Sequence, residues 1–145
     1  MRGTYYPFFL EGKVVNGNKK AGSERRVKIT VPGPLPDLNQ IINAAKTHWT
    51  KYRRMKQEYT DLVAWCAKGQ EQVERADFVF TWYAPDRRTD PDNLSAGGSK
   101  MILDGLIKAG VLTGDGWRQV RSIRHVFEVD KERPRVEIEI RSVEQ

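Results

Sequence analysis

Hydrophobic side chains recur at two different spacings along this chain, and this change of period most limits the folds open to it. Four segments have the apolar composition or alternation typical of strands: 27–31, 77–84, 120–129 and 135–141. Two segments repeat their apolar residues every three or four positions, as amphipathic helices do: 50–68 and 93–109. The predicted order of elements is therefore β, α, β, α, β, β.

This irregular order favours an α+β fold, with a small mixed sheet and two main helices, over a doubly wound sheet. The last two strands can pair as a hairpin through residues 130–134. The chain has 145 residues, of which 39% are hydrophobic, and this suffices for one core. We expect a single domain over residues 27–145, preceded over residues 1–26 by a hairpin or extension that contains the turn signal Asn16-Gly17.

The composition narrows the classes of function. Lys and Arg number 25 against 19 Asp and Glu, giving a net charge of +6 that favours polyanionic partners without specifying a site. The single cysteine, Cys66, excludes a disulfide framework and a cysteine-rich zinc site, and it fits a reducing cytoplasm. We expect a soluble, cytoplasmic protein with no membrane span, and no nucleotide cofactor because the phosphate-binding glycine loops are absent.

Acidic residues mark the start of the second predicted helix. Asp90 and Asp92 flank Pro91, whose fixed φ suits a first helical position, so both carboxylates can gather at the helix N-terminus. With Asp115 as a third acid, they could hold a hard dication such as Mg²⁺. The alternative is an ordinary helix start, in which the acids cap free amides and complement the helix dipole.

The run RRTDPDNLSAGGSKMILDGLIKAGVLTGDGWRQV, residues 87–120, resembles the central block of RusA-type Holliday junction resolvases. In that family a D-x-D-N element opens a helix, a D-[AG]-L segment and a glycine turn follow, and an acidic loop closes the block. The preceding VKITVPGPLPDLNQ, residues 27–40, is similar to the family's strand and proline-asparagine loop. The resemblance covers residues 27–141 and leaves the first 26 outside it.

The resemblance implies an intertwined homodimer that resolves Holliday junctions in recombination and repair, by Mg²⁺- or Mn²⁺-dependent phosphodiester hydrolysis. Asp90, Asp92 and Asp115 match the catalytic acids and are the expected metal ligands. The family's lysine four residues after the second acid is replaced by Ala96, and Lys100 is the nearest substitute, one helical turn further on. The closing loop usually has paired aspartates, whereas here Gly114 precedes Asp115.

Helix geometry bears on three further points. Asp104 lies about 18 Å along the helix from Asp92, too far to share a metal, so we expect it to be structural or exposed. Gly97-Gly98 predicts either a bend in the helix or the close approach of something large, such as a DNA backbone or a partner helix. Asp115 could reach Asp92 within one chain only if the helix is short or broken; otherwise Asp115 and Lys100 meet acids of the other subunit.

Several polar and basic residues are candidates for binding DNA: Arg87, Arg88, Asn39, Lys46, Lys51, Arg53 and Arg54. Trp49 and Tyr52 lie among them and could stack on unpaired bases, although a place in the core is the alternative. His48 and His125 lack a partner at metal-ligand spacing.

Three functions remain in competition. The first is the junction resolvase, and the second is a nuclease that prefers other branched DNA, such as flaps or forks. The third is a non-catalytic basic DNA-binding protein in which the acidic motif only caps a helix.

Overall fold

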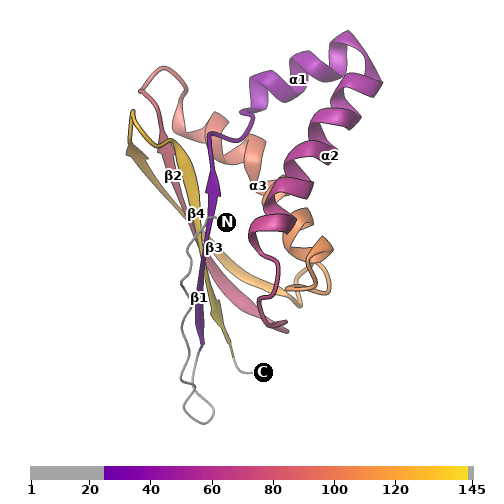
Figure 1. Ribbon diagram of the computed structural model, residues 1–145, viewed down its shortest axis with the longest axis vertical. Coiled ribbons are helices and arrows are strands. Elements are labelled where there is room, and N and C mark those ends of the chain that lie inside the picture. Colours follow the sequence, from indigo (N-terminus) through magenta and orange to yellow (C-terminus); the bar gives the residue numbers. More distant parts are fainter. Residues whose placement is uncertain (1–24, 144–145) are drawn as a thin grey trace.

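The protein is an α+β fold with four strands and three helices, as a computed structural model that describes residues 25–143 shows (Figure 1). The strands are β1 (Arg26–Pro32), β2 (Ala76–Ala84), β3 (Val120–Val129) and β4 (Arg135–Ser142). The helices are α1 (Leu38–Thr47), α2 (Trp49–Cys66) and α3 (Pro91–Lys108). The predicted fold class is confirmed, and nearly all of the expected N-terminal extension, residues 1–24, lies outside the described residues.

The strands form one mixed sheet in the order β1-β4-β2-β3. β4 is antiparallel to both of its neighbours, whereas β2 and β3 are parallel and are joined through α3, as a parallel pair requires a crossover connection. The predicted hairpin of the last two strands is wrong, because β2 lies between them. β2 has a buried residue at every second position from Ala76 to Ala84, so the central place in the sheet covers its apolar face.

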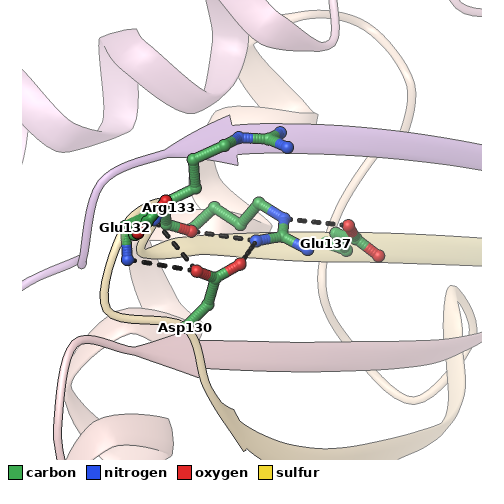
Figure 2. A network of polar contacts seen from close by, with 5 residues as sticks. Asp130, Glu132, Arg133 and Glu137 are labelled. Atoms are coloured by element: carbon green, nitrogen blue, oxygen red, sulfur yellow. Dashed lines mark hydrogen bonds and ion pairs between the residues drawn. The ribbon is translucent and has the colours of Figure 1, made fainter.

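Polar contacts fix the turn that carries the chain across β2, from β3 to β4. Asp130 accepts hydrogen bonds from the backbone amides of Glu132 and Arg133 at 3.2 and 3.1 Å (Figure 2). Its second carboxylate oxygen accepts from Arg135 at 2.8 Å, and Arg135 also donates to Glu137. Because Arg135 is at the same time stacked over Tyr83 of β2, this turn is locked to the strand that it crosses.

The core lies between the helices and one face of the sheet (Figure 1). Alternate residues of the strands point into it, among them Val31, Phe78, Phe80 and Ile138, which are all almost fully buried. The opposite face of β2 and β4 is only half-buried. The helices therefore stand on a single apolar face, which is the arrangement typical of α+β domains.

The sequence did not predict α1, which begins directly after the proline-rich loop. Asp37 caps it, accepting from the Gln40 amide at 2.8 Å, while the Gln40 side chain accepts from the Asp37 amide at 3.0 Å. Asn39 therefore lies in the first turn of a helix and not in a loop. His48 then separates α1 from α2, and its Nδ1 accepts from the Thr50 amide at 3.2 Å.

Candidate active site

The acidic motif lies at the N-terminus of α3, as the sequence predicts. Asp90 is the N-cap residue, in extended conformation, Pro91 is the first helical residue, and Asp92 lies in the first turn. Asp90 makes no side-chain hydrogen bond to the helix that it caps, although it occupies the cap position. Asp90 and Asp92 are both exposed, so their carboxylate oxygens are accessible from solvent.

The two glycines of α3 pack against other parts of the same chain, and the helix continues through them to Lys108. A Cβ atom on Gly97 would lie 2.3 Å from the backbone oxygen of Pro36, and one on Gly98 would lie 2.7 Å from the ring of Trp82. The close approach that the sequence predicts at these glycines therefore occurs, but the groups that approach are the backbone at Pro36 and the ring of Trp82 in the same chain, in place of DNA or a partner helix. The two glycines let α3 approach the start of α1 and the sheet, which fixes the position of Asp92.

Lys100 and Asp115 meet within one chain. The Lys100 ammonium donates to Asp115 at 2.6 Å and lies 3.1 Å from Asp104, one helical turn further along α3. Asp104 in turn lies 3.8 Å from Lys56 of α2. Lysines and aspartates thus alternate from α2 across α3 to the loop before β3.

These contacts shift the ionisation of both partners. The hydrogen bond from Lys100 holds the pKa of the Asp115 carboxyl below its usual value of 3.8. The hydrogen bonds to Asp115 and then to Asp104 raise the pKa of Lys100. At neutral pH Lys100 is thus a cation held between two carboxylates, and Asp115 is ionised.

The acidic start of α3 and the pair of Lys100 and Asp115 are separated. Lys100 follows Asp92 by eight residues, a rise of about 12 Å in a helix, and it holds Asp115 near the middle of α3. Within residues 25–143 no three carboxylate, imidazole or thiol side chains lie close enough together to hold a metal ion. Asp90, Asp92 and Asp115 therefore do not form a ready set of three ligands in one chain.

The donor chemistry at the start of α3 nevertheless fits a hydrated hard cation. Mg²⁺ keeps several waters and is commonly held by one or two carboxylates together with the phosphates of a substrate. Asp90 and Asp92 supply two such carboxylates, both exposed and separated in sequence only by Pro91. A third acid would have to come from outside this end of the helix.

The predicted DNA-binding residues are all exposed and lie in three places: the loop before α3, the start of α1 and the corner between α1 and α2. Arg87 and Arg88 are exposed in the loop before α3, where Asp86 accepts from the Arg88 amide at 2.9 Å. Asn39 is exposed at the start of α1, near the segment that packs on Gly97. The other four are exposed near the corner between α1 and α2: Lys46, Lys51, Arg53 and Arg54.

A groove with a volume of about 360 Å³ is lined by residues of the packed helices α2 and α3. Tyr52, Arg53 and Lys56 line it from α2, and Asp104 lies on its α3 side. Trp49 is 59% exposed and has the Arg53 guanidinium 4.9 Å from its ring centre, so its alternative assignment to the core is wrong. The groove joins the basic corner of α2 to the ion pairs around Lys100.

Sequence reasoning missed three residues of this region. Asp104 was assigned no role in the site, although its spacing of four from Lys100 could have indicated an ion pair. Lys56 could not be placed, because only the packing of α2 on α3 brings it to Asp104. Trp117, two residues after Asp115, is 95% exposed. No pattern in the sequence predicts this exposure.

His125 has a structural position on the edge strand β3. Its Nδ1 accepts a hydrogen bond from the indole nitrogen of Trp82 at 3.0 Å, and burial lowers the pKa of the imidazole. The ring is therefore neutral at pH 7 and supports the indole on which Gly98 packs.

No family model matches the chain, and a search of curated proteins finds no similar sequence. The resemblance to RusA-type resolvases therefore rests on the motifs of residues 27–141 alone. None of the helices in the described part of the chain has the length and apolar character needed to span a membrane.

Proposed function

We propose that this protein is a metal-dependent endodeoxyribonuclease that resolves Holliday junctions, acting as a homodimer of the RusA type. Asp90, Asp92 and Asp115 are the proposed catalytic and metal-binding acids, and Lys100 is the proposed catalytic lysine. The substrate is branched DNA, gripped through its phosphates by the exposed cations around the acidic helix start.

One observation carries the proposal: the Asp90 carboxylate occupies a cap position without capping. A cap aspartate normally accepts a hydrogen bond from an amide of the first turn, and Asp90 does not. The interpretation of the motif as a mere helix cap predicts that bond. Its absence leaves the Asp90 carboxylate available for a ligand beside the exposed Asp92, which supports the catalytic interpretation.

Each residue has a defined task in this proposal. Asp90 and Asp92 would hold Mg²⁺ or Mn²⁺, and the ion when bound would activate water and stabilise charge on the scissile phosphate. The N-terminus of α3 adds a partial positive charge that favours the phosphate in the same place. Arg87 and Arg88, exposed just before the helix, supply cations that position the DNA backbone.

The separation of Asp115 from Asp92 supports a site shared between two subunits. In one chain Lys100, which holds Asp115, lies about two helical turns beyond Asp92. A homodimer that places Lys100 and Asp115 of one chain beside Asp92 of the other would complete two equivalent sites. Two sites related by a dimer axis would also account for paired nicks in a four-way junction.

The test is cleavage of a synthetic four-way junction beside a matched linear duplex, in Mg²⁺, Mn²⁺ and EDTA. Wild-type protein should make symmetric nicks in the junction alone, and only with metal. Asp92→Asn should bind the junction at least as tightly as wild type, because a negative charge near the phosphate is removed. It should not cut the junction, because a proposed metal ligand is lost. Binding by both proteins without cutting under any metal would contradict the proposal and favour a non-catalytic DNA-binding protein.

Competition between substrates separates the resolvase from a nuclease of other preference. Flaps and replication forks offered together with the four-way junction should be cut more slowly than the junction. Faster cutting of a flap or fork would leave the proposed metal-dependent hydrolysis in place and would replace the Holliday junction as the proposed substrate.

A further inference from the structure

Three tryptophans of the described chain are exposed, and they differ in what covers their rings. Trp49 is 59% exposed beneath the Arg53 guanidinium, and Trp65 is 65% exposed with the Lys68 ammonium 5.0 Å from its ring centre. Trp117 is 95% exposed, so nearly all of its indole is open to solvent. Such a bare aromatic surface is what a stacking partner would cover.

The loop that carries Trp117 is held in place by hydrogen bonds on both sides of it. Gln119 accepts from the Gly116 amide at 3.2 Å and donates to Thr113 at 3.2 Å. Arg75 lies 3.4 Å from the carbonyl oxygen of Trp117, which accepts from its guanidinium. The backbone is thus fixed while the indole is open to solvent, so only the side-chain rotamers of Trp117 remain to be ordered when a ligand stacks on it.

The position of this indole relates it to the proposed active site. Trp117 follows Asp115 by two residues, and Asp115 is bonded to Lys100. Arg118, the next residue, is also exposed and adds a cation at the same place. An aromatic face beside a cation is the combination with which proteins bind unpaired nucleotides, the ring stacking on the base and the cation meeting the phosphate.

We infer that Trp117 is a base-stacking residue, which receives a nucleobase unstacked at the branch point and so places the neighbouring phosphodiester at Asp115. This inference rests on the proposed function, because it deepens the recognition of branched DNA. It explains how a protein that reads backbone shape could distinguish a branch from a linear duplex: only the branch presents a base that can leave its stack at low cost.

The experiment measures binding in EDTA, so that it does not depend on cleavage. Full-length wild type, Trp117→Ala and Trp117→Phe are titrated against a four-way junction carrying 2-aminopurine at the branch point, and against a linear duplex. Trp65→Ala is the matched control, since it also removes an exposed indole. Thermal unfolding of each variant, followed by circular dichroism, verifies that the fold is retained.

We expect Trp117→Ala to bind the junction about 5- to 150-fold more weakly than wild type, as alanine substitution at base-stacking aromatics does. Trp117→Phe should retain most of the affinity, and Trp65→Ala all of it. Wild type should quench the 2-aminopurine fluorescence on binding, whereas Trp117→Ala should not. Binding to the linear duplex should be the same for all four proteins.

Three outcomes would overturn the inference. Equal affinity and equal quenching for wild type and Trp117→Ala would show that the indole contacts no base, while the proposed function would stand. A change of sedimentation in DNA-free Trp117→Ala would assign the indole to contact with a second copy of the chain. Failure of wild type itself to bind the junction would overturn the proposed function, and this inference with it.

Discussion

Two helices of this protein begin with an aspartate at the N-cap, and the two aspartates behave differently. Asp37 opens α1 with a reciprocal capping box, in which both its side chain and its backbone amide are bonded to Gln40. Asp90 opens α3 in a similar extended conformation and makes no such bond. The same residue type at the same helix position is thus used for stability in one case and left available in the other, which is why the second is the candidate for chemistry.

The largest effect should come from removing the acids of α3. Asp90→Asn or Asp92→Asn should lower junction cleavage by at least about a hundredfold, since even outer-shell partners of a metal commonly cost 10- to 100-fold. The free energy of unfolding should change by less than about 0.5 kcal/mol for Asp90→Asn, because its side chain makes no cap bond. Initial cleavage rates and urea denaturation measure the two quantities.

Asp37→Asn is the matched control for this loss of charge, because asparagine also caps a helix. It should leave cleavage and stability close to wild type. An equal loss of cleavage in Asp37→Asn would mean that cleavage depends on the charge at the start of either helix. Asp90 would then not differ from Asp37 in its role.

The second prediction tests whether Asp92 of one subunit and Asp115 of the other serve one site. Asp92→Asn and Asp115→Asn should each be inactive alone. Mixed and allowed to exchange subunits, they should recover about a quarter of the wild-type sites, because half of the dimers are mixed and each has one intact site. Single nicks in the junction, resolved on a denaturing gel, report this recovery.

A mixture as inactive as its components would place all three acids of each site in one chain. Asp115 would then have to leave Lys100 to reach the start of α3. Mixing Asp92→Asn with Asp90→Asn is the control, since both residues belong to the same end of the helix and no intact site can form.

The third prediction is the opposite pattern for α1, in which a substitution lowers stability and leaves cleavage unchanged. Asp37→Ala should lower the free energy of unfolding by about 0.5–2 kcal/mol, as the loss of a cap does. The cleavage rate of the folded fraction should remain near that of wild type. Urea denaturation and cleavage rates compare Asp37→Ala with Asp37→Ser, which restores a capping oxygen and should restore stability.

The smallest effect concerns the pair of Lys100 and Asp115. The lowered pKa of Asp115 means that its contribution to stability is present above its usual pKa of 3.8 and is lost as the pH falls through the lowered value. The raised pKa of Lys100 means that its contribution is present below its usual pKa of 10.5 and is lost as the pH rises through the raised value. The ion pair of Lys100 and Asp115 therefore stabilises the fold at every pH between the lowered pKa of Asp115 and the raised pKa of Lys100.

Both side chains are partly exposed, so solvent screening keeps this stabilisation below about 1 kcal/mol. Asp115→Asn should be less stable than wild type by that small amount at pH 7, and the difference should vanish at acidic pH. Thermal unfolding measured across the pH range checks this. A difference that persisted with the wild-type carboxyl protonated would indicate that the substitution is destabilising for reasons other than charge.

Hydrophobic period alone was enough to predict the fold class and most of the elements. The strands and the two long helices lie where the period placed them, within one or two residues, because a strand or helix with one buried face must repeat its apolar residues at its own period. The acidic helix start was equally local, since Pro91 and the flanking acids fix it within a few residues.

Which elements are neighbours could be learned only from the folded chain. The strand order inserts β2 between β3 and β4, although the short loop of residues 130–134 favoured a hairpin. Likewise α1, whose capping box lies in the residues assigned to a loop, packs on Gly97 of α3. Local period does not specify these choices, because they depend on which apolar faces cover one another best.

For the candidate site, too, the sequence predicted the residues and only the folded chain showed their contacts. Residue type and order nominated Asp90, Asp92, Lys100 and Asp115, but the sequence could not show that Asp115 returns to Lys100 or that the Asp90 carboxylate makes no cap bond. It also could not show that Trp117 stands fully exposed on a fixed loop. These facts depend on contacts between residues far apart in the chain, whose free energies are settled only when the whole domain has packed.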